Sequence, residues 1–195
     1  MRDKDQTKQN ILQAVGKLLA NGDGSLGINT IAREAGVDKV LIYRYFGGLP
    51  ELLRAFAASG EFWPGFEDIM ETSPYVAAMM TPTEIGARFV HGFIRELRSR
   101  PLTLEILRHE GGSQNELTSE LTQVREASTR ELAECYADRG QNTVTLHALV
   151  TAGIIHLLLQ AKHAEKFCGV DIRSDEGWQR IERAAIAVFE RTGEK

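Results

Sequence analysis

Apolar residues recur with the period of an α-helix through nearly every segment of this chain of 195 residues. No stretch keeps the alternation of apolar and polar residues that marks a half-buried strand. Turn-forming glycines and prolines divide the sequence into about nine helical segments. We therefore predict an all-α fold, in which an N-terminal three-helix domain precedes a larger helical domain.

The boundaries of the expected helices follow from the apolar spacing and from the residues that end helices. The expected helices cover residues 6–20, 28–34, 39–46, a segment beginning near Pro50, 83–100, a segment beginning at Pro101, 116–138, 143–167 and 176–191. The first of them should bury Ile11, Ala14, Val15, Leu18 and Leu19. Residues 169–175 should form a loop between the last two helices.

The composition is ordinary for a water-soluble globular protein, with 43% hydrophobic and 26% charged residues. No apolar run approaches the ~18–20 residues that cross a bilayer, and the charged first residues do not resemble a secretory signal. Cys135 and Cys168 have no metal-binding spacing. We therefore expect a cytoplasmic protein with reduced thiols and no membrane partner.

Charge is distributed unevenly along the chain, although the net charge of −4 gives no general sign of affinity for nucleic acid. Residues 1–48 hold seven Lys and Arg against five Asp and Glu, a balance of +2. Residues 49–195 hold sixteen against twenty-two, a balance of −6. Because DNA binding needs only a local positive surface, this asymmetry fits a DNA-contacting domain at residues 1–48 and a separate domain at residues 49–195.

The segment INTIAREAGVDKVLIYRYFG, residues 28–47, has the spacing of a helix-turn-helix. Ala32 is small enough for a second helix to cross closely over the first. Gly36 tolerates the positive φ with which the chain leaves the first helix. Ile42 packs back between the two helices, and Asp38 is placed to cap the second. From this window alone, an ordinary helical corner remains the alternative.

The residue pattern continues on both sides of this segment. It comprises Thr7-x3-Ile11-Leu12-x-Ala14, Leu18-Leu19-Ala20-x-Gly22, Ile28-x2-Ile31-Ala32-x2-Ala35-Gly36-Val37, Ile42-Tyr43-x-Tyr45-Phe46 and Glu51-x-Leu53. Over residues 7–53 and without a gap, this pattern resembles the N-terminal domain of the TetR/AcrR family of transcriptional regulators. The family usually has Thr or Ser at Gly27, Thr or Ala at Leu41, and Lys at Leu49, so polar contacts are lost here while the fold is kept.

The resemblance implies a sequence-specific DNA-binding transcriptional regulator whose second motif helix enters the major groove. The implied DNA-binding residues are Asn29, Lys39, Val40, Leu41, Tyr43, Arg44 and Tyr45. The two tyrosines should reach phosphates, Asn29 a base or a phosphate, and the other four residues should face bases. Each has a plain structural alternative, because an Arg on a short helix is usually solvated and Tyr45 could belong to the core.

The resemblance also implies a repressor that a small-molecule effector releases from a palindromic operator. The candidate effector-binding residues are Trp63, Phe66, Tyr75, Phe89, His91, Phe93, His109, Tyr136 and His147. Because most aromatic residues at helical spacing are core, each of them has that alternative. The two apolar C-terminal helices are implied to pair with those of a second copy, which makes a homodimer.

Signatures of other functional classes are missing from the sequence. It has no GxSxG, GxxxxGK[ST] or HExxH motif, and no GxGxxG after a strand, which argues against an enzyme. The five histidines include no i, i+4 pair that would hold a metal on a helix, and we expect no cofactor. A helical protein-interaction module with weak or lost DNA binding is the alternative function, because Leu49 replaces a cation.

Overall fold

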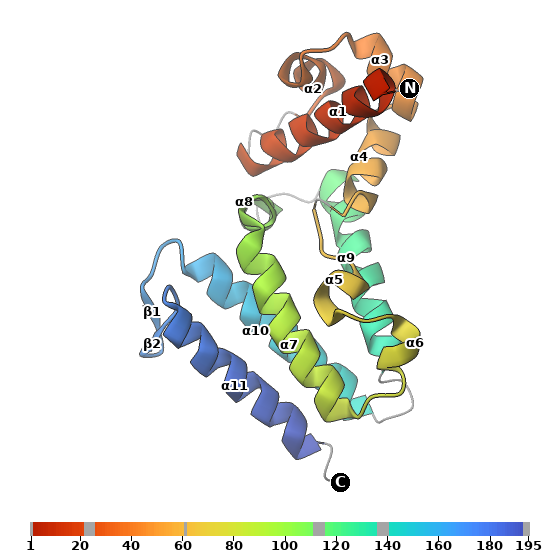
Figure 1. The fold of residues 1–195 in the computed structure, drawn as a ribbon. Coiled ribbons are helices and arrows are strands. Elements are labelled where there is room, and N and C mark those ends of the chain that lie inside the picture. The colour runs from red at the N-terminus through yellow and green to blue at the C-terminus, as the bar shows by residue number, and fades with distance from the viewer. Residues whose placement is uncertain (1, 22–25, 61, 111–115, 136–140, 193–195) are drawn as a thin grey trace. The chain divides into compact units, whose positions relative to one another are not determined.

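The computed structural model describes residues 2–21, 26–60, 62–110, 116–135 and 141–192. Over these residues the chain forms eleven helices and one short hairpin (Figure 1). The elements are α1 (Arg2–Asn21), α2 (Ile28–Ala35), α3 (Lys39–Phe46), α4 (Leu49–Ala58), α5 (Phe66–Met70), α6 (Pro74–Ala77), α7 (Pro82–Ser99), α8 (Pro101–Glu110), α9 (Glu116–Glu134), α10 (Gln141–Gln160), β1 (Lys166–Phe167), β2 (Val170–Asp171) and α11 (Asp175–Thr192). The predicted all-α fold is confirmed.

Two of these helices are not foreseen by the sequence analysis, which expects about nine. α5 and α6 have five and four residues, so neither is long enough to show an apolar period. α1 begins at Arg2 and not near Gln6, because its first turn is polar and has no apolar stripe. The buried face expected of α1 is confirmed, since Ile11, Ala14, Val15, Leu18 and Leu19 are all buried.

The prediction of a helix over residues 143–167 is wrong about where that helix ends. α10 ends at Gln160, and β1 and β2 form an antiparallel hairpin in which Phe167 lies opposite Val170. Cys168 and Gly169 form the two-residue turn, with φ of 49° and 80°. Positive φ at both positions suits a tight hairpin, but Cys-Gly lacks the Asn or Asp that usually signals such a turn.

The residues after the hairpin also explain why α10 stops. The guanidinium of Arg173 donates hydrogen bonds to the carbonyl oxygens of Ala161 at 2.7 Å and Lys162 at 3.0 Å. These bonds satisfy carbonyl groups that a continuing helix would have bonded. The indole nitrogen of Trp178 donates to the carbonyl oxygen of Ile172 at 2.8 Å, and both side chains are buried. The connection between α10 and α11 is therefore an ordered part of the fold.

The described residues form two compact units. The first contains Met1–Trp63 and Pro101–Glu126, and the second contains Pro64–Arg100 and Ala127–Lys195. α8 therefore packs with the N-terminal helices, although α7 separates it from them in sequence. These units are defined by packing. The predicted division by function, into residues 1–48 and 49–195, stays a prediction.

In the first unit, α1 is the helix on which α2, α4 and α8 pack. α8 lies close to α1 at Gly16, where an added Cβ would be 2.9 Å from Cδ2 of Leu102 and 3.2 Å from the ring of Phe56. The buried hydroxyl of Thr103 donates a 2.6 Å hydrogen bond to the carbonyl oxygen of Phe62. α8 is thus fixed both to α1 and to the segment that follows α4.

In the second unit, α7 packs against α5, α10 and α11 (Figure 1). Two glycines make this close approach possible. A Cβ on Gly92 would lie 1.8 Å from the carbonyl oxygen of Ile69, and a Cβ on Gly86 would lie 2.4 Å from Cγ of Phe189. Both contacts are far shorter than packed atoms allow, so α5 and α11 lie where they do because α7 has no side chain at these points.

Among the described residues, one helix is long and apolar enough to cross a membrane by length and composition alone. Its window Thr143–Gln160 has a mean hydropathy of 1.5, and 22% of the window is buried. The prediction that no apolar run reaches this length does not account for this helix. Polar residues interrupt its apolar run, but none of them adds a formal charge. A single helix of this length and composition does not by itself indicate a membrane span, because soluble proteins also contain such helices.

Candidate nucleic-acid interface

α2 and α3 cross through a small core of the predicted residues. Ile31, Ala32 and Ile42 are buried. Gly36 ends α2 in the left-handed conformation, with φ of 66°, and the amide of Val37 then donates to the carbonyl oxygen of Ala32 at 3.0 Å. This is the hydrogen-bonding pattern of a glycine C-cap. The spacing read from the sequence therefore forms a tight turn between two helices.

The two helices of this motif begin differently. Asp38 caps α3, because its Oδ1 accepts a 2.8 Å hydrogen bond from the amide of Val40. Gly27 occupies the N-cap of α2 with extended backbone and offers no side-chain acceptor. The first amides of α2, at Ile28, Asn29 and Thr30, therefore point out of the helix without a side-chain cap.

The exposed face of α3 carries the residues expected to meet bases. Lys39, Val40, Tyr43 and Arg44 are exposed, whereas Ile42 on the opposite side is fully buried. Val40 is 61% exposed and Tyr43 is 52% exposed, although apolar and aromatic side chains usually avoid water. Leu41 and Tyr45 lie next to this face on the helix surface and are half-buried. The six predicted residues of α3 thus include four on its outer face and two at its edge.

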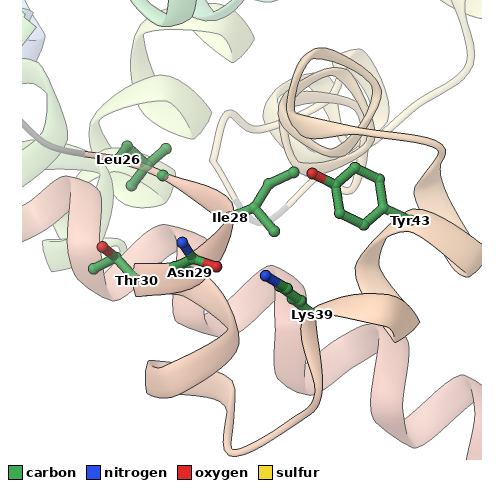
Figure 2. A pocket seen from close by; sticks show the side chains of 7 residues that line it. Leu26, Ile28, Asn29, Thr30, Lys39 and Tyr43 are labelled. Atoms are coloured by element: carbon green, nitrogen blue, oxygen red, sulfur yellow. The ribbon is translucent and has the colours of Figure 1, made fainter.

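An open depression of about 490 Å³ lies between α3 and the start of α2 (Figure 2). It is lined by Leu26, Gly27, Ile28, Asn29, Thr30, Lys39 and Tyr43. Figure 2 shows the ammonium of Lys39 directed toward Asn29, and the hydroxyl of Tyr43 directed toward Ile28. The uncapped amides and the positive end of the α2 dipole lie beside a cation and a hydroxyl, a combination that attracts an anion.

Lys4 also lies at this surface, although its sequence position does not indicate such a role. Its Nζ lies over the ring of Tyr45, 5.8 Å from the ring centroid, so the first turn of α1 lies beside α3. The ammonium is therefore within the range of a cation–π interaction. The only signal in the sequence is a run of mixed charges at the start of α1, which indicates no partner.

The predicted effector-binding residues are only partly brought together. Phe89, Phe93 and His147 form one buried cluster, with ring centroids 5.1 Å apart for the two phenylalanines and 4.0 Å apart for Phe89 and His147. Trp63 is buried in the first unit and Phe66 in the second. Tyr136 and the side chain of His109 lie outside the described part of the chain.

The other two candidates lie on the surface. Tyr75 is 78% exposed on α6. His91 is exposed on α7, and its Nδ1 lies 2.8 Å from a carboxylate oxygen of Glu182 on α11. In the part of the chain that the structure describes, no group of three or more His, Cys, Asp or Glu side chains is placed to hold a metal. The effector-binding assignments therefore stay predictions.

His147 is buried deeply enough to change its chemistry. It is 1% exposed, and burial lowers its pKa from the ordinary 6.5 to about 4. The ring is therefore neutral at pH 7, because a charged imidazolium would lose its hydration inside the protein. The cluster of Phe89, Phe93 and His147 consequently carries no formal charge.

Burial of His147 predicts a specific pH dependence of stability. Between pH 6.5 and 4 the unfolded chain binds this proton and the folded chain does not, so stability falls as the pH falls through that range. The loss between pH 7 and pH 5 should be about 2 kcal/mol. In His147→Leu this loss should disappear. Urea unfolding of both proteins at the two pH values checks this, and an equal loss in both would show that His147 is not the responsible group.

The comparisons with known proteins agree with this geometry. Residues 11–56 match the model of the bacterial regulatory proteins of the tetR family. No curated protein sequence matches the chain significantly. Among solved structures, a TetR transcriptional regulator from Rhodococcus sp. RHA1 is 15% identical, with a TM-score of 0.55 over 95% of this chain and 96% of that chain. A TetR transcriptional regulator from Agrobacterium tumefaciens is 18% identical, with a TM-score of 0.57 over 94% and 92%.

The structural matches extend over nearly the whole chain and show the fold, while the family match covers the segment that contains α2, the turn and α3. The resemblance predicted from the sequence pattern is confirmed over residues 11–56 by the family model, and the structural matches show that the chain shares the fold. Residues 11–56, which contain the helix-turn-helix, therefore match the tetR family of bacterial regulatory proteins, and the chain as a whole has the fold seen in TetR transcriptional regulators.

Proposed function

We propose that the chain is a cytoplasmic repressor that binds a palindromic operator as a homodimer and leaves it when a small-molecule effector binds. The observation that carries the proposal is the outer face of α3, where Lys39, Val40, Tyr43 and Arg44 stand exposed above a buried Ile42. An α-helix of this kind fits the major groove, where base edges present a readable pattern of donors and acceptors.

The roles of the side chains follow from their chemistry. Arg44 can donate two hydrogen bonds to the O6 and N7 atoms of guanine, and Val40 can contact a thymine methyl group. A DNA phosphate fits the depression at the start of α2, where uncapped amides, Lys39 and the Tyr43 hydroxyl are close together. Such a phosphate would take the place of the missing side-chain cap. Base contacts supply specificity in this arrangement, and phosphate contacts fix the register.

Removal of the Arg44 side chain should weaken operator binding by roughly 1–3 kcal/mol and relax the preference at one base pair in each half-site. The matched control is Arg130→Ala, which removes an exposed arginine from α9. Binding to duplexes substituted at each position checks the prediction. If Arg44→Ala keeps the wild-type affinity and preference, α3 does not read the DNA through this residue.

The homodimer is proposed from the exposed face of α10. The twenty residues of this helix contain no Asp, Glu, Lys or Arg, and Ala148, Leu149, Ala152 and Gly153 are exposed on it. Leu149 is 67% exposed. A long uncharged helix face is costly to leave in water, and a second copy of the same helix would cover it with small residues at the crossing point. α11 adds the exposed Val188.

Leu149→Glu should convert the dimer into a monomer, because each subunit would place an unpaired carboxylate in an apolar contact. Met79→Glu is the matched control, since Met79 on the same unit is 66% exposed but does not lie on α10. Sedimentation at micromolar concentration should give about twice 21.7 kDa for the wild type and the control, and 21.7 kDa for Leu149→Glu. A monomeric wild type would contradict the proposed dimer.

The effector site is proposed at the cluster of Phe89, Phe93 and His147. Its side chains are buried, so a ligand must displace them, and its neutral imidazole favours an uncharged ligand that is apolar or amphipathic. Such a ligand releases DNA only if it binds more tightly to a conformation that fits DNA poorly.

Uncharged aromatic compounds should therefore release the protein from its operator, and Phe93→Ala should shift the concentration needed for release. Fluorescence anisotropy of labelled operator, titrated with each compound, measures the release. Parallel thermal unfolding identifies compounds that bind. Compounds that raise the unfolding temperature and leave DNA affinity unchanged in every case would contradict an effector-released repressor.

A further inference from the structure

We propose that Lys4, in the first turn of α1, is a DNA-binding residue that neutralises a backbone phosphate on the side of the major groove away from α2. The inference deepens the proposed function and rests on it. It starts from the position of the Lys4 ammonium, which lies 5.8 Å from the ring centroid of Tyr45 on α3. Lys4 is exposed, so its charge remains available to a ligand.

The two tyrosines of α3 point to opposite sides of the helix. Tyr43 and Tyr45 are two residues apart, which places them about 200° apart around the helix axis. Tyr43 lines the depression at the start of α2, whereas Tyr45 meets the start of α1. The exposed face with Val40 and Arg44 lies between them. α3 therefore has one flank beside α2 and another beside α1.

A helix in the major groove has a phosphate backbone on each side, because the groove is bounded by both strands. The α2 flank meets one strand with its free amides and Lys39. The second strand must pass the α1 flank, where Tyr45 is half-buried and Lys4 lies over its ring. The Tyr45 ring holds the ammonium at this edge of α3, and an ammonium at such a position is suited to a phosphate oxygen.

The charge of Lys4 gives a measurable signature. Each cation that neutralises a DNA phosphate releases a counterion, which adds about −0.9 to the slope of log affinity against log salt. Lys4→Gln should therefore make this slope shallower by about 0.9 for each subunit bound. If Lys4 only stabilised the fold through Tyr45, the variant would lose thermal stability and keep the wild-type slope. Lys4→Arg, which keeps the charge, should restore the slope.

Lys17 supplies the matched control. It is exposed on the same helix, thirteen residues further along, which is about 20 Å from Lys4 along the axis. Lys17→Gln makes the same change in net charge, so it reports any general effect of charge on DNA affinity. The experiment measures the affinity of wild type, Lys4→Gln, Lys4→Arg and Lys17→Gln for a random-sequence duplex between about 50 and 200 mM salt. Random DNA is suitable because phosphate contacts do not read sequence.

The expected result is a shallower slope for Lys4→Gln alone. Equal slopes for Lys4→Gln and wild type, or an equal change in Lys4→Gln and Lys17→Gln, would overturn the inference while leaving the proposed function intact. A wild type that binds neither random DNA nor DNA from upstream of its own gene would overturn the proposed function and this inference with it. Thermal unfolding of each variant confirms that the compared proteins are folded.

Discussion

The close crossing of α2 and α3 is the contact on which the proposed DNA-binding surface depends. Ala32 leaves room for α3, Ile42 fills the space between the helices, and Gly36 turns the chain with a positive φ. Because Ile42 is buried, the residues on the opposite side of α3 are forced outward. The same crossing brings the uncapped start of α2 beside Tyr43.

α1 supports this surface in two ways. Its buried face holds α2, α4 and α8, so the motif rests on a helix with a continuous apolar stripe. Its first turn places Lys4 at the outer edge of α3. At its other end, Gly16 admits Leu102 of α8. The helix-turn-helix motif therefore belongs to a unit that includes a helix from much later in the sequence. Because α8 contacts α1 directly, a shift of α8 would act on α1.

The motif could be predicted from sequence because its determinants are local. Ala32, Gly36 and Ile42 lie within eleven residues, and each has a physical role that its type and spacing reveal. Lys4 could not be found in this way, because its contact with Tyr45 joins distant parts of the chain. The burial of His147 and the packing of α8 against α1 also depend on contacts between distant parts of the chain, so they could not be predicted from local sequence. The hairpin after α10 could not be predicted from the sequence, because Cys168 is an unusual residue at such a turn.

Selection of bound sequences from a pool of random DNA shows directly whether α3 reads the major groove as part of a symmetric dimer. We expect enrichment of an inverted repeat whose half-sites are centred about one helical turn apart, ~34 Å, or a multiple of it. Arg44→Ala should select a related repeat with one base pair less defined in each half. If the wild-type protein enriches no common sequence, α3 does not read DNA in this way.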